Sequence, residues 1–204
     1  MRDNLIRVAI EKFGKRGFDA VGTREIAAAV DTPMSSITYH FGGKEGLYLA
    51  AAEYIFGELR NAVQAGEQQQ PGKKASPEER IDMLCNTLKR VGQFMLREES
   101  APFALFIGRE QQAPSHGVLD LMRDGMRPMM DGFVAQLRLL RPNLDERQAQ
   151  ATAIFLFGMA ITLRHSRASI LILMDKEDID AETGELLLAQ LEQSARLVLE
   201  GGTR

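Results

Sequence analysis

Residues 23–47 read TREIAAAVDTPMSSITYHFGGKEGL, a pattern that predicts two short helices joined by a tight turn. In the first half, Ile26, Ala27 and Val30 recur at the spacing of one helix face, so we expect a short amphipathic helix there. This helix must end near Val30, because Pro33 disfavours a helical conformation for the residue before it.

A second short helix follows the turn. We expect Pro33 to open it, since proline is well tolerated in the first helical turn, and Thr32 to cap it. Ile37 and Phe41, four residues apart, can pack on the first helix. The rest of the circumference carries small, polar or aromatic side chains, namely Met34, Ser35, Ser36, Thr38, Tyr39 and His40. A short helix with so few apolar residues gains little from burial, so we expect its outer face to contact a polar partner.

Helical patterns flank this stretch on both sides. Residues 4–16 place five apolar side chains on one helix face, and Gly17 provides a stop signal. Residues 44–65 predict a longer helix, and the polar, Gly- and Pro-containing residues 66–77 predict an exposed loop. Residues 1–46 therefore predict a three-helix head, and no strand pattern occurs there or later in the chain.

These residues resemble the helix-turn-helix of the TetR family of bacterial transcriptional regulators. The family pattern is Thr-x-x-Ile-Ala, a turn, a Ser-rich recognition helix that ends in an aromatic cluster, and then Lys-Glu-x-Leu. The segment with Arg109-Glu110 and Pro114, and the later Gly158 with Arg164 and Arg167, is similar to a subgroup of this family with a Tyr-His-Phe recognition-helix end. Three positions depart from the pattern: Asp31 replaces the usual turn Gly, Pro33 a frequent Ser, and Thr38 a common Tyr.

The resemblance implies an all-α fold with a three-helix helix-turn-helix DNA-binding head, residues 1–46, on an all-helical ligand-binding and dimerisation body, residues 47–204. It implies a homodimer that represses transcription and is released by a small-molecule effector. The two recognition helices would enter successive major grooves of a near-palindromic operator in double-stranded DNA, about 34–36 Å apart.

By the same resemblance, the head residues divide into two groups. Phosphates would be held by Thr23, Tyr39, His40 and Lys44. Bases would be faced by Arg24, Met34, Ser35, Ser36 and Thr38.

The end of the chain is its most apolar part. Residues 144–174 and 181–199 predict two apolar helices, which would expose apolar surface in a monomer. We expect them to pair with a second copy as a four-helix bundle, with Leu187 and Leu191 in the interface.

A few charges stand in otherwise apolar helices of the body, and such charges need partners. They are Arg109, Glu110, Arg164 and Arg167. One hypothesis is a buried ion-pair network, and the other is a clamp for an anionic or polar ligand. Met126 and Met130 belong to a Met-rich segment that could line an adaptable apolar cavity for that ligand, although ordinary core packing is the alternative.

The composition is that of an ordinary globular protein, with 204 residues, 45% of them apolar and 26% charged. Residues 1–46 contain seven basic and six acidic side chains, a net charge of +1. Residues 47–204 contain 18 basic and 22 acidic side chains, a net charge of −4. This asymmetry has the sign expected of a DNA-binding head on an acidic body.

Several classes of protein are disfavoured. There is no signal-peptide pattern and no uncharged apolar run long enough to cross a bilayer, so we expect a cytoplasmic protein with no membrane partner, associated with the nucleoid when bound to DNA. The single Cys85 and three His residues offer no spaced metal-ligand cluster. We predict no metal, no cofactor, no catalytic residues and no enzymatic activity.

The competing hypothesis is a helical small-molecule carrier or enzyme in which the N-terminal motif is only a structural unit. Salt-dependent binding to duplex DNA would separate the two hypotheses.

Overall fold

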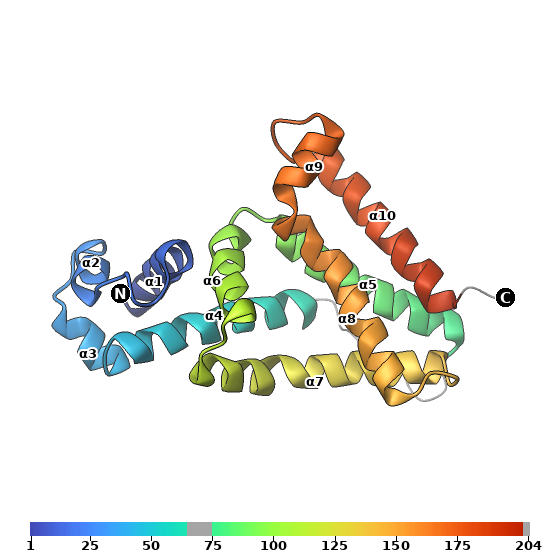
Figure 1. The fold of residues 1–204 in the computed structure, drawn as a ribbon, viewed down its shortest axis with the longest axis horizontal. Coiled ribbons are helices and arrows are strands. Elements are labelled where there is room, and N and C mark those ends of the chain that lie inside the picture. The colour runs from blue at the N-terminus through green and yellow to red at the C-terminus, as the bar shows by residue number, and fades with distance from the viewer. Residues whose placement is uncertain (65–74, 202–204) are drawn as a thin grey trace. The chain divides into compact units, whose positions relative to one another are not determined.

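The computed structural model describes residues 1–64 and 75–201 (Figure 1). The described residues form ten α-helices and no strand, which confirms the predicted all-α fold. The helices are α1 (Arg2–Arg16), α2 (Thr23–Ala28), α3 (Ser35–Phe41), α4 (Lys44–Gln64), α5 (Pro77–Leu96), α6 (Ser100–Gln112), α7 (His116–Leu140), α8 (Glu146–His165), α9 (Arg167–Met174) and α10 (Ala181–Glu200). Most of the loop predicted at residues 66–77 lies outside the described residues.

The chain packs as two compact units. The first combines Met1–Arg60 with Glu98–Arg127, and the second combines Asn61–Arg97 with Pro128–Arg204. The first unit therefore contains α6 and parts of α4 and α7 in addition to α1, α2 and α3. The functional boundary at residue 46 stays a prediction.

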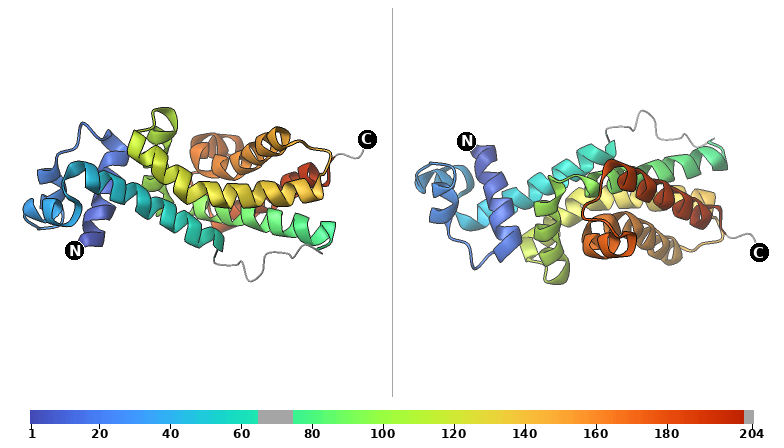
Figure 2. Two further views of the ribbon diagram at one scale, coloured as in Figure 1. Left: turned by 90° about the horizontal axis from the view of Figure 1, so that it is seen from below. Right: turned by 90° about the horizontal axis from the view of Figure 1, so that it is seen from above.

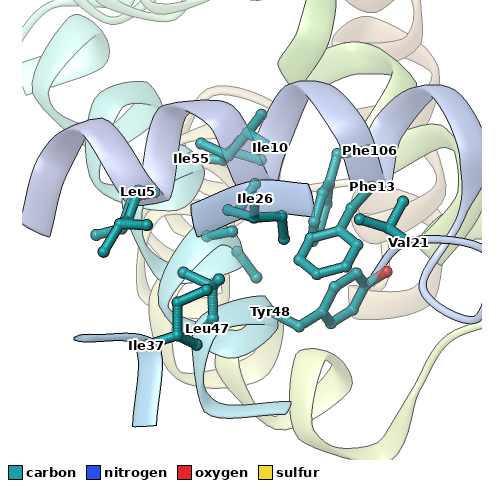
Figure 3. Packing of buried hydrophobic residues seen from close by; sticks show 14 of the residues in the cluster. Leu5, Ile10, Phe13, Val21, Ile26, Ile37, Leu47, Tyr48, Ile55 and Phe106 are labelled. Atoms are coloured by element: carbon teal, nitrogen blue, oxygen red, sulfur yellow. The ribbon is translucent and has the colours of Figure 1, made fainter. Parts of the chain in front are cut away.

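The core of the first unit is apolar and draws on helices that are far apart in the sequence (Figure 3). The core residues labelled there, each at most 6% exposed, are Leu5, Ile10, Phe13, Val21, Ile26, Ile37, Leu47, Tyr48, Ile55 and Phe106. Full burial of one such aliphatic or aromatic side chain stabilises the fold by about 1.5–3 kcal/mol. Helices α1 and α6 approach closely at Gly14, where an added Cβ would lie 3.0 Å from the carbonyl oxygen of Pro102.

In the second unit, α5 packs against both α8 and α10, and Figure 2 shows α5 and α10 side by side. The helices pack tightly at Gly92 on α5. A Cβ added there would lie 2.9 Å from Leu191, 3.0 Å from Leu188 and 3.1 Å from Leu163. Gly92 therefore lets leucines from two helices converge on α5. Leu191 is only 6% exposed, so its predicted place in a dimer interface is wrong.

The predicted single helix at residues 144–174 is also wrong, because α8 and α9 are separate helices that meet at a bend of 73°. Ser166 at the bend has φ −105° and ψ 23°, outside the α-helical region, and its N–H donates to Thr162. Neither Gly nor Pro marks this bend, and apolar side chains continue through it, so the hydrophobic pattern did not reveal the break.

No single helix among the described residues is long and apolar enough to cross a membrane. Only α8 and α9 taken together, bent as they are, pass that test of length and composition.

In the described part of the chain, four arginines contact the last carbonyl groups of other helices. Arg109 donates to Gly14 in α1 (2.9 Å), Arg90 to Val63 in α4 (2.9 Å), Arg164 to Met95 in α5 (2.7 Å) and Arg141 to Val198 in α10 (3.1 Å). The last four carbonyls of a helix have no partner within the helix and carry its negative dipole end, so a guanidinium satisfies them and is favoured there.

Candidate nucleic-acid interface

The turn between α2 and α3 depends on one residue in a left-handed conformation. Asp31 has φ 48°, where most residues with a side chain are disfavoured and Asp and Asn are tolerated. The backbone then doubles back, so that the N–H of Thr32 donates to the carbonyl of Ala27 (3.1 Å). Asp31 therefore takes the conformation that the family's usual glycine would supply.

The recognition helix α3 starts differently from the sequence prediction. Thr32 does not cap it: its hydroxyl pairs with the Ser36 hydroxyl (2.9 Å), and the residue before the helix, Met34, is already helical, with φ −56° and ψ −29°. The N–H of Ser36 donates to Pro33 and that of Ile37 to Met34, at 3.0 and 3.1 Å. These i to i−3 bonds form a tight first turn, which places Pro33 two residues before the helix rather than at its first position.

Helix α3 has one buried side and one open side. Ile37 is 1% exposed, and Phe41 packs against the core of the first unit, as their spacing predicts. On the other side Tyr39 is 84% exposed and Met34 48% exposed. Of the remaining predicted contacts on this helix, Ser35 and Thr38 are exposed, and Ser36 and His40 are half-buried. The outer face is thus polar and accessible, with few apolar contacts to the fold.

The charges on α2 are arranged so that a cation faces outward. Arg24 is exposed. Its neighbour Glu25 accepts from Lys12 and from Arg16 of α1, each at 2.8 Å. The hydrogen bond from Lys12, with that from Arg16, lowers the pKa of the Glu25 carboxyl. The one carboxylate of α2 is therefore neutralised by α1, which leaves the surface beside Arg24 suited to an anion. Thr23, the other predicted contact on α2, is half-buried at its first position.

Lys44 stands at the start of α4, where the helix dipole also favours anions. The preceding Gly42 and Gly43 have φ values of 75° and 135°, which residues with a side chain rarely adopt, and they allow the chain to turn from α3 into α4. The ammonium of Lys44 lies 4.4 Å from the ring centroid of Phe18 and 3.5 Å from the carbonyl oxygen of Asp19. Both contacts hold the side chain in place without neutralising its charge.

Helices α3 and α4 touch at Gly46. A Cβ added to Gly46 would overlap the carbonyl oxygen of Phe41, the last residue of α3, and would lie 2.9 Å from its carbonyl carbon. The end of the recognition helix therefore rests directly on the first turn of α4. Gly46 could not be recognised from the sequence, because it is the variable position of Lys-Glu-x-Leu.

The charged residues predicted to share one site have different partners. Arg109 is exposed and donates to the carbonyls of Gly14 (2.9 Å) and Lys15 (3.0 Å). Glu110, 5% exposed, accepts from the Tyr48 hydroxyl at 2.5 Å and from Ser115. The two neighbours therefore bind separate helices of the first unit. The role of Tyr48 could not be predicted from the sequence. It has the pattern of an ordinary core aromatic, and no local signal indicates its contact with Glu110.

In the second unit, Arg164 donates to the carbonyls of Met95 and Arg97 at the end of α5. Arg167 forms an exposed ion pair with Asp178. A buried position, as the network hypothesis requires, does not hold for Arg109, which is exposed, or for the exposed ion pair of Arg167.

The predicted methionines are half-buried. Met126 packs against the core of the first unit, and Met130 lies on α7 within the second. A surface hollow of about 440 Å³ in the second unit is lined by Ala135, Arg138, Leu139 and Pro142. None of the six predicted ligand residues is among those four.

Two family models match the chain. The model described as bacterial regulatory proteins, tetR family, matches residues 5–51, which span the helices and turns described above. The model of the C-terminal domain of the HTH-type transcriptional dual regulator CecR matches residues 77–202, more than half of the chain. This chain is a TetR-family protein. It is a DNA-binding transcriptional regulator, and members of its family bind DNA and small-molecule effectors and act as dimers.

Individual TetR-family proteins are similar over nearly the whole chain. The dual regulator CecR of Shigella flexneri is 28% identical over 98% of this chain and 92% of its own. A putative transcriptional regulator from Pseudomonas aeruginosa PAO1 has the same fold, with a TM-score of 0.72 and 16% identity over 98% of this chain and 90% of its own. A putative regulator from Saccharomonospora viridis, solved in complex with choline, matches with a TM-score of 0.60 and 17% identity over 98% and 96%.

Proposed function

We propose that this TetR-family regulator represses transcription by binding a near-palindromic operator as a homodimer, and that a small-molecule effector releases it. The observation that carries the proposal is the open polar face of α3, with Tyr39 84% exposed beside Ser35 and Thr38. A helix that keeps hydroxyl and aromatic groups in solvent, while burying mainly Ile37, is suited to the floor of a major groove.

Each predicted contact has a proposed role. Phosphates are held by Thr23, Tyr39, His40 and Lys44, of which Lys44 also benefits from the helix dipole. Bases are faced by Arg24, Met34, Ser35, Ser36 and Thr38. Arg24 is suited to the acceptor edge of a guanine, because its guanidinium can donate twice to the base.

The proposed homodimer follows from apolar side chains on the surface of the second unit. Ile154 and Phe155 on α8 are 64% and 75% exposed, and Leu186 and Leu197 on α10 are 57% and 64% exposed. Each helix has another side buried in the same unit. Pairing α8 and α10 with those of a second copy covers this surface as a four-helix bundle.

Gly158 supports the same arrangement. It lies one turn beyond Ile154 and Phe155, and a Cβ added to it would have no other atom within 4 Å. No packing within the described chain therefore requires a glycine there, whereas a close crossing with a partner helix would. We propose that the partner's α8 or α10 crosses at this point.

Effector release is proposed to act through α4, which leads directly from the recognition helix into the body. A ligand that favours a second position of α4 would move the two heads out of register, and it could do so only by its difference in affinity for the two states. The ligand contacts of Met126 and Met130 stay predictions. Arg109, Glu110, Arg164 and Arg167 already bind protein groups, so we assign them no ligand.

Selection of genomic fragments bound by the purified protein tests the proposal. We expect a near-palindromic site whose affinity falls steeply with salt, because each neutralised phosphate releases counterions. If no fragment is enriched and duplex DNA binds without salt dependence, the rival reading of a helical carrier or enzyme with a structural N-terminal unit would replace ours. We also propose that the protein has no enzymatic activity and that it acts on the bacterial nucleoid. Enrichment of a genomic fragment would support both proposals.

A further inference from the structure

The end of α6 holds three other segments of the first unit through two adjacent residues. Arg109 donates to the carbonyls of Gly14 and Lys15, the last turn of α1. Glu110 accepts a hydrogen bond from the hydroxyl of Tyr48 in α4. It also accepts from the N–H and the hydroxyl of Ser115, which immediately precedes α7. A displacement of this end of α6 therefore reaches α1, α4 and α7 together.

Glu110 is buried, with 5% of the residue exposed, and both of its carboxylate oxygens accept hydrogen bonds. One oxygen accepts from Tyr48 at 2.5 Å, and the other accepts from Ser115 N at 2.9 Å and Ser115 Oγ at 3.0 Å. These donors are uncharged, and they come from different helices. Because a buried carboxylate is costly without donors, α4 and the start of α7 are held to one another through Glu110.

The ring of Tyr48 fixes the other end of this link. It packs edge-on against Phe13 and Phe18, each with ring centroids 5.0 Å apart, and at 4.6 Å from Phe106. Burial, followed by the hydrogen bond to Glu110, raises the pKa of Tyr48 well above its ordinary value, so its hydroxyl remains a donor. The side chain is held on all sides and moves with α4.

The same part of α4 touches the recognition helix. Gly46, two residues before Tyr48, lies against the carbonyl of Phe41 at the end of α3. Because the two positions belong to one turn of one helix, a shift of α4 at Tyr48 also shifts the end of α3. Glu110 and the recognition helix are thus connected through Tyr48 and the contact of Gly46 with Phe41.

We propose that Glu110 is the positioning residue that holds α4 in its operator-binding arrangement, through its hydrogen bond to Tyr48. This inference rests on the proposed repressor function and adds to it the contact that positions α4. Arg109 and Glu110 then hold helices together and form neither a ligand clamp nor an ion pair.

Tyr48→Phe tests the inference, because it removes the hydroxyl and keeps the ring in its core. Ser115→Ala is the matched control, since it removes one hydrogen bond from the same carboxylate on the side of α7 and leaves Tyr48 bound. The measurements are the affinities of the full-length protein for a selected operator duplex and for a scrambled duplex of the same length, together with thermal unfolding.

We expect Tyr48→Phe to lower operator affinity roughly tenfold, while binding to the scrambled duplex is unchanged, because phosphate contacts tolerate a misplaced head better than base contacts do. Ser115→Ala should keep the operator affinity. A merely structural role would lower stability and reduce both affinities in proportion to the folded fraction, so the ratio of the two affinities isolates positioning.

An unchanged ratio in Tyr48→Phe, or an equal drop in Ser115→Ala, would overturn the inference while leaving the repressor proposal intact. Failure of the proposed function looks different, since the wild-type protein itself would then not distinguish operator from scrambled duplex.

Discussion

Replacing Gly46 by alanine tests whether the recognition helix is seated on α4. The added Cβ would overlap the carbonyl oxygen of Phe41 and lie 2.9 Å from its carbon. Ordinary van der Waals contact for a Cβ begins at 3.4 Å. The obstacle is backbone and cannot rotate away, so the end of α3 must move from α4 by about 1 Å or more in a close-packed interior.

Two opposing effects set the stability of Gly46→Ala. Alanine in a helix interior is favoured over glycine by about 0.5–1 kcal/mol. Overpacking a tight contact costs about 1–3 kcal/mol. We expect a net loss of about 1–2 kcal/mol, which for a chain of this size lowers the melting temperature by about 3–6 °C.

The effect on operator binding should be larger than the effect on folding. Hydrogen bonds to base edges need donor–acceptor distances of about 2.7–3.2 Å, and a shift of about 1 Å takes a donor out of that range. Loss of one good base contact costs about 1–3 kcal/mol in discrimination, so operator affinity should fall more than about tenfold.

Gly57→Ala is the matched control, because Gly57 lies in the same helix and its added Cβ would meet only the Arg60 guanidinium, at 3.9 Å. That variant should melt about 1–3 °C higher than wild type and bind the operator normally. Far-UV circular dichroism and fluorescence anisotropy with the selected operator measure both quantities. If Gly46→Ala behaved like Gly57→Ala in both assays, our account of the α3–α4 contact would be refuted.

Four further outcomes follow from the structure. Lys44→Ala should weaken operator and scrambled DNA alike and flatten the salt dependence by about one phosphate per head, whereas a changed base preference with the same slope would contradict a phosphate role. In sedimentation, Gly158→Met should dissociate the dimer more than about tenfold without unfolding it, while Gly132→Met, at a position on α7 that is equally open within the chain, should stay dimeric. Burial raises the pKa of the Cys85 thiol to about 11, so below that pH the folded protein should resist alkylation. Denaturant should expose the thiol to the reagent. Rapid labelling of the native protein would show that Cys85 is not buried. Arg164→Met should lower the melting temperature by a few degrees through loss of the contact with α5, and loss of effector release with unchanged stability would restore the ligand clamp.

The head could be predicted closely because its signals are local. Pro33 and the apolar spacing mark where the turn falls, and Asp31 takes the left-handed conformation that Asp tolerates. The start of α3 was misplaced, because a side-chain cap and a tight first turn satisfy the same N–H groups and the sequence Thr-Pro-Met permits either.

The dimer surface could be predicted only to the level of the helix. Leu186, Leu187 and Leu188 are consecutive, so the sequence does not show which of them faces the surface. The structure leaves Leu186 57% exposed and buries Leu191 beside Gly92, on another helix far away in the sequence. The register of α10 is thus set by a glycine on α5, and no local pattern in α10 carries that information.

The charges within the apolar helices show most clearly why the rest of the candidate site could not be predicted from the sequence. The pattern indicates that Arg109 and Arg164 need partners, and the partners it suggests are carboxylates or ligands. Their partners are main-chain carbonyls at the ends of α1 and α5, groups that every helix leaves unsatisfied and that no side-chain pattern advertises. Glu110 likewise depends on donors from α4 and from the start of α7, brought together only by the fold. An arginine in an apolar helix of such a protein is therefore first to be tested as a donor to the carbonyl groups at the end of another helix.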